Sequence, residues 1–351
     1  MSRAREFADL AGSADAGGLT GRNLIINGDF QVNQRGTSGD WLADRQRFLV
    51  NGSYGGFTRT VETLSSGSPY DAGFRKFGRV TVDTATNHTD SYELTWYRLE
   101  AQDIAKSGWD YTSPNSSITM SFWVRSSVAD TYYFQARTVD GTEYIYNATF
   151  ALTADTWKKV TVTMPGNSNL QFDNDANAGL TVAIVADHGA TYIGGEEATT
   201  NSWYTRGGNS DAYFPSGAFA AEWANVANAT FDWTGMQLEV GEKATPFEHR
   251  SYGEELLLCS RYYTESDYRS DTGGARRYTS VSSSINDLGG IPFPVPMRAT
   301  PTRKVLTAQI FSGVTGSSYY IDSTGYSRRG NSSGATSYFM SAGSDGWDAE
   351  L

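Results

Sequence analysis

The sequence predicts an all-β protein: a jelly-roll β-sandwich followed by a short linker helix and a small C-terminal β-domain. Strand-like segments fill residues 23–250, separated by turn signals such as Asp140-Gly141 and Pro165-Gly166. No regular helical pattern alternates with these segments, which argues against a βαβ topology. Aromatic residues make up 13% of the 351 residues and Gly numbers 37, a composition typical of sandwiches and barrels.

Residues 1–22 are expected to form a separate N-terminal arm. Phe7, Leu10 and Ala11 fall at i, i+3 and i+4, which is one stripe of a short amphipathic helix. Such a helix is too short to persist alone in water. We therefore expect an attachment or oligomerisation arm that orders against a partner, and a frayed tail is the alternative.

Residues 23–250 hold the segments expected to form the jelly roll. The clearest are SITMSFWVRSS, DTYYFQARTV, EYIYNATFAL, WKKVTVTMPG, GLTVAIVAD and TFDWTGMQLEV. Each alternates apolar and polar residues with a period of two, the pattern of a strand with one buried face. About eight such strands joined by long loops fit a two-sheet jelly roll.

A short linker helix is predicted over residues 251–263. Ser251-x-x-Glu254 is a capping box, and the apolar block that follows leaves the helix little polar face. We expect this helix to be covered on several sides, by both β-domains or by neighbouring subunits. Cys259 is then a buried apolar residue rather than a nucleophile.

The remaining residues, 264–351, are expected to form the small C-terminal β-domain. Pro292, Pro294, Pro296 and Pro301 exclude a central strand there and favour an edge strand or an extended arm.

Charge and cysteine content exclude several classes of function. The net charge of −11 disfavours partners such as nucleic acid and anionic membranes. No apolar run approaches the length that crosses a bilayer, and the N-terminus lacks the apolar segment of a signal peptide. The single Cys259 excludes an internal disulfide framework and a multi-cysteine zinc site.

No catalytic constellation stands out, so we expect that the protein is not an enzyme. The stretch GNSSG matches the Gly-x-Ser-x-Gly pattern but lacks the preceding strand and following helix that the nucleophile motif requires. Glycoside hydrolysis needs two converging acids, and the pairs Glu196-Glu197 and Asp173/Asp175 are candidates that no further pattern supports.

Calcium is the one cofactor that the sequence suggests. The stretch DNDANAG places Asp173, Asp175 and Asn177 at alternate positions, like the oxygen ligands of a calcium loop. The EF-hand pattern fails, because Ala178 and Ile184 stand where the turn glycine and the bidentate acid belong. A solvated acidic turn is the alternative.

Aromatic and polar residues opposite the predicted core face indicate a glycan-binding surface. Flat rings beside planar hydrogen-bonding groups suit sugar rings, which have apolar faces and hydroxyl edges. We expect one sheet face to present most of them together, with a nearby loop adding the rest. The alternative is that they are buried or covered by a neighbouring subunit. The candidates are Trp123, Arg125, Tyr133, Gln135, Arg137, Trp203, Tyr204 and Tyr213.

Four stretches together resemble a family of tailed-bacteriophage virion proteins. They are LTGRNLIINGDFQVNQRGTS, ITMSFWVRSS, GMQLEVGEKATPFEHRSYGEELLLCSRYY and IPFPVPMRATPT. The segment EELLLCSRYY is the most specific part, and neither the last fifty residues nor the region 187–228 shares the resemblance. Members are tail-fibre or structural proteins whose main domain resembles a carbohydrate-binding-module jelly roll.

The resemblance implies a non-enzymatic virion protein, a tail fibre or a decoration or head-fibre subunit, assembled in the host cytoplasm. It implies a homo-oligomer, with a trimer favoured, that attaches to other virion proteins through the N-terminal arm. Calcium near the N-terminal strand of such modules makes Asn27 and Asp29 ligand candidates by analogy. The expected function is adsorption to bacterial surface polysaccharide. A purely structural virion component and a polysaccharide-degrading tailspike are the alternatives.

Overall fold

The computed structural model describes most of the chain in two compact units, residues 1–250 and residues 251–351. The described residues are 21–51, 56–85, 89–194, 199–205, 213–214, 223–267, 277–278, 285–307, 311–312, 314–332, 338–340 and 344–351. Residues 1–20, which include the helix expected in the N-terminal arm, lie outside them. Within these ranges, no helix is both long and apolar enough to cross a bilayer.

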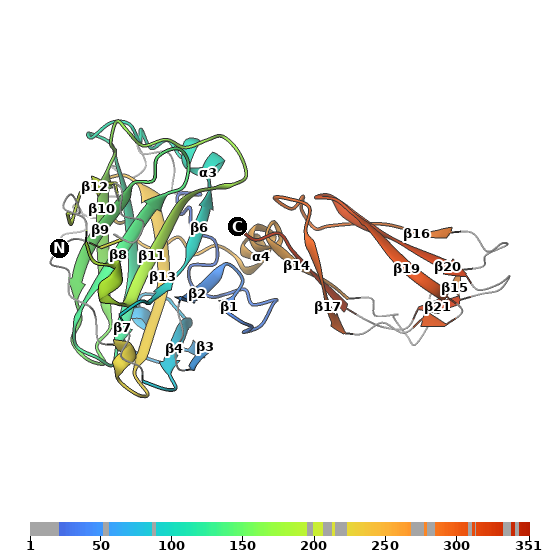
Figure 1. The fold of residues 1–351 in the computed structure, drawn as a ribbon, viewed down its shortest axis with the longest axis horizontal. Coiled ribbons are helices and arrows are strands. Elements are labelled where there is room, and N and C mark those ends of the chain that lie inside the picture. Colours follow the sequence, from blue (N-terminus) through green and yellow to red (C-terminus); the bar gives the residue numbers. More distant parts are fainter. Residues whose placement is uncertain are drawn as a thin grey trace. The chain divides into compact units, whose positions relative to one another are not determined.

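The first unit is a sandwich of two antiparallel sheets (Figure 1). Among the described residues, the large sheet has eight strands, in the order β1 (Trp41–Ala43), β2 (Gln46–Asn51), β5 (Tyr92–Thr95), β11 (Ala178–His188), β8 (Thr131–Thr138), β9 (Ile145–Ala151) and β12 (Trp203–Tyr204), with β6 (Tyr97–Glu100) also paired to β11. The small sheet has five: β10 (Lys158–Pro165), β7 (Ser117–Ser126), β13 (Thr230–Val240), β4 (Lys76–Val82) and β3 (Phe57–Thr63). The connections contain the helices α2 (Ser68–Asp71) and α3 (Ala101–Ala105) and the 3-10 turns Ala190–Tyr192 and Trp223–Asn225.

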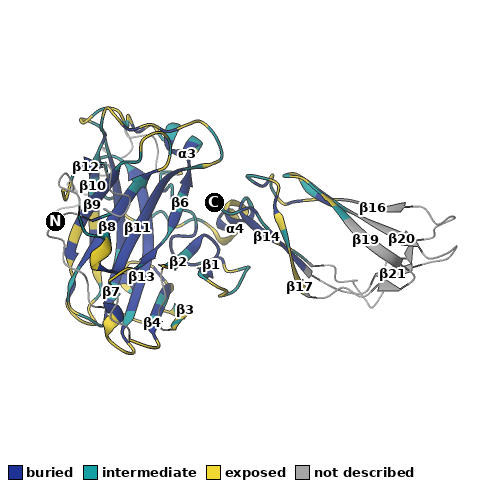
Figure 2. Ribbon diagram, viewed as in Figure 1, coloured by how far each residue is buried: buried dark blue, intermediate teal, exposed yellow. Residues whose placement is uncertain are grey.

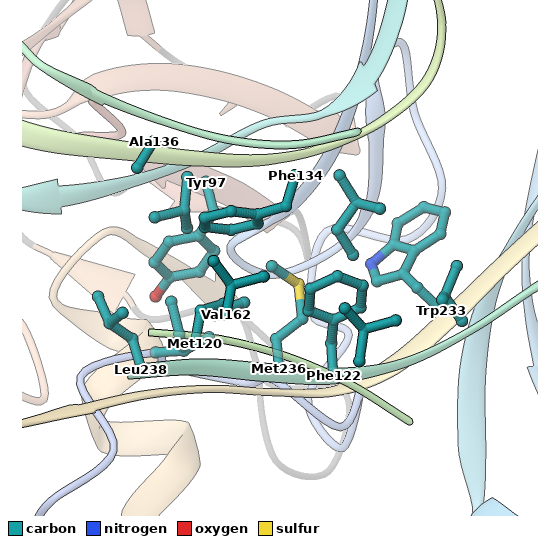
Figure 3. Close-up of a cluster of buried hydrophobic side chains, with 14 of the residues drawn as sticks. Tyr97, Met120, Phe122, Phe134, Ala136, Val162, Trp233, Met236 and Leu238 are labelled. Carbon is teal, nitrogen blue, oxygen red and sulfur yellow. The ribbon is translucent and has the colours of Figure 1, made fainter. Parts of the chain in front are cut away.

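A core of apolar side chains lies between the two sheets (Figure 3). Strand β7 contributes Ile118, Met120, Phe122 and Val124, alternate residues that are all 0% exposed. Phe134 of β8 meets them from the large sheet, with its ring centroid 6.2 Å from that of Phe122. Figure 2 shows β11 and β13 buried along nearly their whole length. The period-two pattern therefore predicted the core-facing residues of β7 correctly, but β11 and β13 are buried on both faces and not on one as expected.

The alternation of β13 is interrupted at one glycine. Trp233 and Met236 both belong to the core, although they are three residues apart. Gly235 accommodates the extra residue, because its φ of +64° lies in a region that L side chains rarely adopt. A Cβ at this position would also lie 2.5 Å from the ring of Phe74. A run that reads as one continuous strand thus contains a β-bulge.

The second unit begins with helix α4 (Tyr252–Ser260) and continues as strands. Its described residues form three three-stranded antiparallel sheets: β14 (Tyr263–Asp267), β22 (Ser344–Asp348) and β17 (Thr302–Thr307); β16 (Ile285–Pro292), β20 (Gly325–Ser332) and β19 (Val314–Ile321); β15 (Arg277–Tyr278), β21 (Tyr338–Met340) and β18 (Phe311–Ser312). Trp347 is fully buried at the centre of a small core and stacks on Tyr326 at 4.2 Å. The predicted fold class, a jelly-roll sandwich followed by a short helix and a small β-domain, is confirmed.

Helix α4 begins as the sequence predicts. Ser251 Oγ accepts a hydrogen bond from Glu254 N at 3.3 Å, and the Glu254 carboxylate accepts one from Ser251 N at 2.9 Å. Cys259 is buried, as predicted. Leu257 and Leu258 are 49% and 37% exposed within the chain. Cover of this helix by a neighbouring subunit therefore stays a prediction.

Candidate functional site

The predicted site residues on β7 and β8 lie on opposite outer faces of the sandwich. The two strands are consecutive in the chain, but β7 lies in the small sheet and β8 in the large sheet. Their inward residues meet in the shared core, so their outward residues point away from each other. Trp123 and Arg125 lie on one outer face, and Tyr133, Gln135 and Arg137 on the other. The prediction that one sheet face presents both groups is therefore wrong.

The outer face of the small sheet is organised around the buried carboxylate of Asp232. Arg125 of β7 and Arg79 of β4 flank Asp232 in register and both bind it. Arg79 Nε lies 2.7 Å from Oδ1, and Arg125 Nη2 lies 2.6 Å from Oδ2. The hydrogen bond that Arg79 donates to Asp232 raises the pKa of the Arg79 guanidinium. We call this region the Asp232 surface, made of Phe77, Arg79, Trp123, Arg125, Trp157 and Asp232.

Aromatic rings pack on the arginines of the Asp232 surface. The Arg125 Cζ atom lies 4.7 Å from the centroid of the Trp157 ring and 5.7 Å from that of Phe77. Trp123 is half-buried in an apolar cluster that includes Phe77. Both arginines of this surface are thus engaged with the protein itself.

Four of the predicted site residues on the large sheet are buried inside the protein. Three side chains from neighbouring strands converge on one main-chain atom, the carbonyl oxygen of Tyr213. Gln135 Nε2, Asn147 Nδ2 and Tyr204 Oη donate to it at 3.1, 2.9 and 2.8 Å. These bonds fix the loop at Tyr213 above the sheet. The buried residues, each at most 9% exposed, are Tyr133, Gln135, Trp203 and Tyr204.

A half-buried group of rings and charges remains on the large sheet. The Arg137 Cζ atom lies 4.6 Å from the centroid of the Tyr213 ring and 5.6 Å from that of Trp96. Arg137 Nη2 donates to Glu143 at 2.8 Å, and its Nε has no hydrogen-bond partner among the described residues. Arg98 also lies near Trp96, with Cζ 5.3 Å from the ring centroid. We call this region the Arg137 surface, made of Trp96, Arg98, Arg137, Glu143 and Tyr213.

The sequence prediction missed Trp96 and Arg98. They occupy outward positions around the short strand β6, and they alternate with the buried Tyr97 and Leu99. This alternation was a usable signal, although the strand is only four residues long.

The large sheet also holds two buried titratable side chains. Glu93 of β5 is paired in register with Asp187 of β11. Burial, reinforced by the charge of Asp187, raises the pKa of the Glu93 carboxyl to about 9. His188 stacks on Phe214 at 3.8 Å, and burial lowers the pKa of its imidazole to about 4. At neutral pH both groups are therefore uncharged.

The calcium candidates near the N-terminus are engaged in local structure. The Asn27 amide closes a turn: its Oδ1 accepts from Val32 N at 2.9 Å, and its Nδ2 donates to Asp44 O at 2.7 Å. Asp29 accepts from Gln31 Nε2 at 2.8 Å, and burial raises the pKa of its carboxyl. In the described part of the chain, no three His, Cys, Asp or Glu side chains group as metal ligands.

The second set of calcium candidates lies in an acidic turn before β11. Asp175 accepts from Asn177 N at 2.9 Å, and Gln171 Nε2 donates to Asp173 at 3.3 Å. Such local bonds are typical of a solvated turn, so a calcium site here stays a prediction. Glu196-Glu197, the other acidic pair considered, lies outside the described residues.

The fold and these two surfaces define an all-β jelly roll with one ion-paired and one half-exposed aromatic face. No protein-family model matches the sequence, and a search of curated proteins finds no match.

Solved structures give remote likenesses only. The chain is similar to the enzymatically active domain of tailspike protein 4 of bacteriophage CBA120, with a TM-score of 0.34 and 8% identity, covering 62% of this chain and 21% of that chain. It is similar to the family 11 carbohydrate-binding module of a Clostridium thermocellum cellulase, with a TM-score of 0.29 and 14% identity over 63% and 96% of the two chains. A xylan-binding domain of Paenibacillus barcinonensis gives a TM-score of 0.30 at 10% identity over 63% and 96%. At these scores the likenesses assign neither a family nor a ligand.

Proposed function

We propose that the first unit binds carbohydrate and that its binding surface is the Arg137 surface. The observation that carries the proposal is the state of Arg137. Its side chain is 17% exposed, lies near the rings of Trp96 and Tyr213, and donates through Nη2 to Glu143, a carboxylate that is itself partly exposed. Aromatic rings next to a partly exposed guanidinium suit the apolar face and the hydroxyl edge of a sugar.

We further propose that the protein is a non-enzymatic subunit of a phage virion, a tail fibre or a decoration subunit that adsorbs to host polysaccharide. The resemblance of residues 235–263 and three other stretches to virion proteins supports this role. A homotrimer displayed in several copies would strengthen weak individual sites by avidity. Light scattering of the full-length protein at micromolar concentration tests the oligomer, and a monomer mass contradicts it.

Binding to host cells and to their purified surface polysaccharide tests the proposed function. Trp96→Ala should weaken binding about tenfold, the usual effect of truncating an aromatic ring in a binding site. Trp123→Ala, on the opposite face, is the matched control and should bind like the wild-type protein. Equal loss in both variants contradicts the assignment of binding to the Arg137 surface. No binding by the folded wild-type protein contradicts the carbohydrate-binding proposal and leaves a purely structural virion component.

A reducing-sugar assay on the same polysaccharide separates binding from degradation. We expect no release of new chain ends by the wild-type protein. Sustained release would instead make the protein a polysaccharide-degrading tailspike.

A further inference from the structure

Two arginines of the Arg137 surface lie in one row across three neighbouring strands. Thr181 of β11 is in register with Arg98 of β6 on one side and with Arg137 of β8 on the other. Residues paired in this way share a sheet face, and Thr181 alternates with core residues of β11, so the row faces outward. Strands two apart are separated by about 10 Å. The row therefore places the backbones of Arg98 and Arg137 about 10 Å apart on one face of the sheet, with both side chains next to Trp96.

Charge on the Arg137 surface runs against that of the whole chain. The protein carries a net charge of −11, whereas this surface has two guanidinium groups and one carboxylate, that of Glu143. Glu143 accepts from Nη2 of Arg137 and is 26% exposed, so solvent screens the pair. The Debye length is about 8 Å at physiological salt, so distant acids contribute little at this point.

We propose that the glycan bound here is acidic, and that Arg98 and Arg137 bind its anionic groups while Trp96 stacks on a sugar ring. This inference rests on the carbohydrate-binding function proposed for the same surface. A guanidinium presents a planar fork of donors that matches a carboxylate, and it also binds sulfate esters well. Trp96 lies within 5.3 and 5.6 Å of the two guanidinium carbons, which places the ring and both charges within reach of neighbouring sugar units.

The experiment uses full-length protein and three galactose-based polymers: polygalacturonate, its carboxyl-reduced neutral product, and a sulfated galactan. Calorimetric titration should give affinity for at least one charged polymer about tenfold or more above that for the neutral one. Comparing the two charged polymers separates carboxylate from sulfate recognition. Raising the salt concentration should reduce this preference, because the contribution is electrostatic.

Variants locate the effect on the surface. Arg98→Gln and Arg137→Gln should each lower affinity for the preferred charged polymer about tenfold and change affinity for the neutral polymer little. Arg75→Gln is the matched control, since Arg75 also lies over an aromatic ring, 4.1 Å from that of Tyr70, but is exposed and away from this surface. A thermal unfolding midpoint within a few degrees of the wild-type value shows that a variant is folded.

The outcomes separate the two proposals. Equal affinity for neutral and charged polymers overturns the acidic-glycan inference and leaves carbohydrate binding in place. An unchanged affinity in both arginine variants, or a loss in Arg75→Gln as large as theirs, also overturns the inference. If the wild-type protein binds none of the three polymers, the acidic-glycan inference fails, whereas the carbohydrate-binding proposal fails only if the protein also does not bind the host polysaccharide.

Discussion

The two outer faces of the sandwich carry similar residues and use them differently. On the small sheet, Arg79 and Arg125 share one fully buried acceptor, Asp232. On the large sheet, Arg137 makes one bond to Glu143, a partly exposed acceptor, and lies near two half-buried rings. Arginine beside tryptophan therefore does not by itself mark a binding surface. The useful distinction is whether the donors are already bound to a buried internal acceptor.

The two sheets also treat their buried acids differently. The small sheet surrounds Asp232 with two guanidinium groups. The large sheet instead holds Glu93 next to another acid, Asp187, and burial keeps the Glu93 carboxyl protonated at neutral pH. The small sheet pairs its buried carboxylate with two guanidinium groups, whereas the large sheet keeps its buried Glu93 carboxyl in the neutral, protonated form. Substitutions of Asp232 and Glu93 test this contrast.

The largest effect is expected from Asp232→Asn. The substitution keeps the shape of the side chain but leaves Arg79 and Arg125 next to each other without their shared counter-ion. We expect a loss of about 3 kcal/mol in the free energy of unfolding, measured by urea denaturation. Glu143→Gln, which removes the partner of Arg137, should cost less than about 1 kcal/mol because that pair is partly exposed. Similar losses of unfolding free energy in the two variants would contradict the difference between the two outer faces.

Glu93→Gln should change the pH dependence of stability. The unfolded chain ionises Glu93 near pH 4.5, whereas the folded protein keeps the proton up to a pKa of about 9. The contribution of Glu93 to the stability is therefore fully present below pH 4.5. It is lost progressively as pH rises from 4.5 to 9, and the loss reaches about 3 kcal/mol by pH 7. The amide of Gln stays neutral, so the variant should show little loss of stability between pH 6.5 and 9.

The range above pH 6.5 isolates Glu93 from His188. The lowered pKa of His188, about 4 instead of 6.5, makes stability rise between these two values, which is the opposite slope. Unfolding curves at pH 7, 8 and 9 therefore report Glu93 with little contribution from the histidine. If Glu93→Gln keeps the wild-type slope in this range, Glu93 is not the group that the large sheet holds neutral.

The smallest effect is expected from Asn147→Ala. This buried amide is one of the donors to the Tyr213 carbonyl and does not belong to the Arg137 surface itself. Its loss should cost about 1 kcal/mol of stability and weaken carbohydrate binding a few fold, because the Tyr213 loop is less well fixed. Thr149→Ala, an exposed position on the same strand, is the control. Equal binding by both variants would show that the loop needs no support from the sheet.

Local patterns predicted local structure well. The alternation in SITMSFWVRSS predicted which face of β7 is buried, because that pattern records a single strand. The capping box predicted the start of α4, since both hydrogen bonds join residues three apart. Neither inference needs knowledge of distant parts of the chain.

Pairing and burial of polar residues could not be predicted in the same way. Whether β7 and β8 share a sheet depends on strands far away in the sequence, and this decided that Trp123 and Arg137 lie on opposite faces. Gln135 resembles a surface residue in an alternating strand, yet it is buried under the Tyr213 loop. Its burial depends on a partner 78 residues away in sequence.

The anchoring of Tyr213 through its carbonyl oxygen has an evolutionary consequence. Every amino acid brings a carbonyl oxygen, so the three bonds that hold this loop do not depend on which side chain stands at the position. The identity of residue 213 can therefore vary under selection while its place on the surface is retained. Recognition can diversify at this point without a new scaffold.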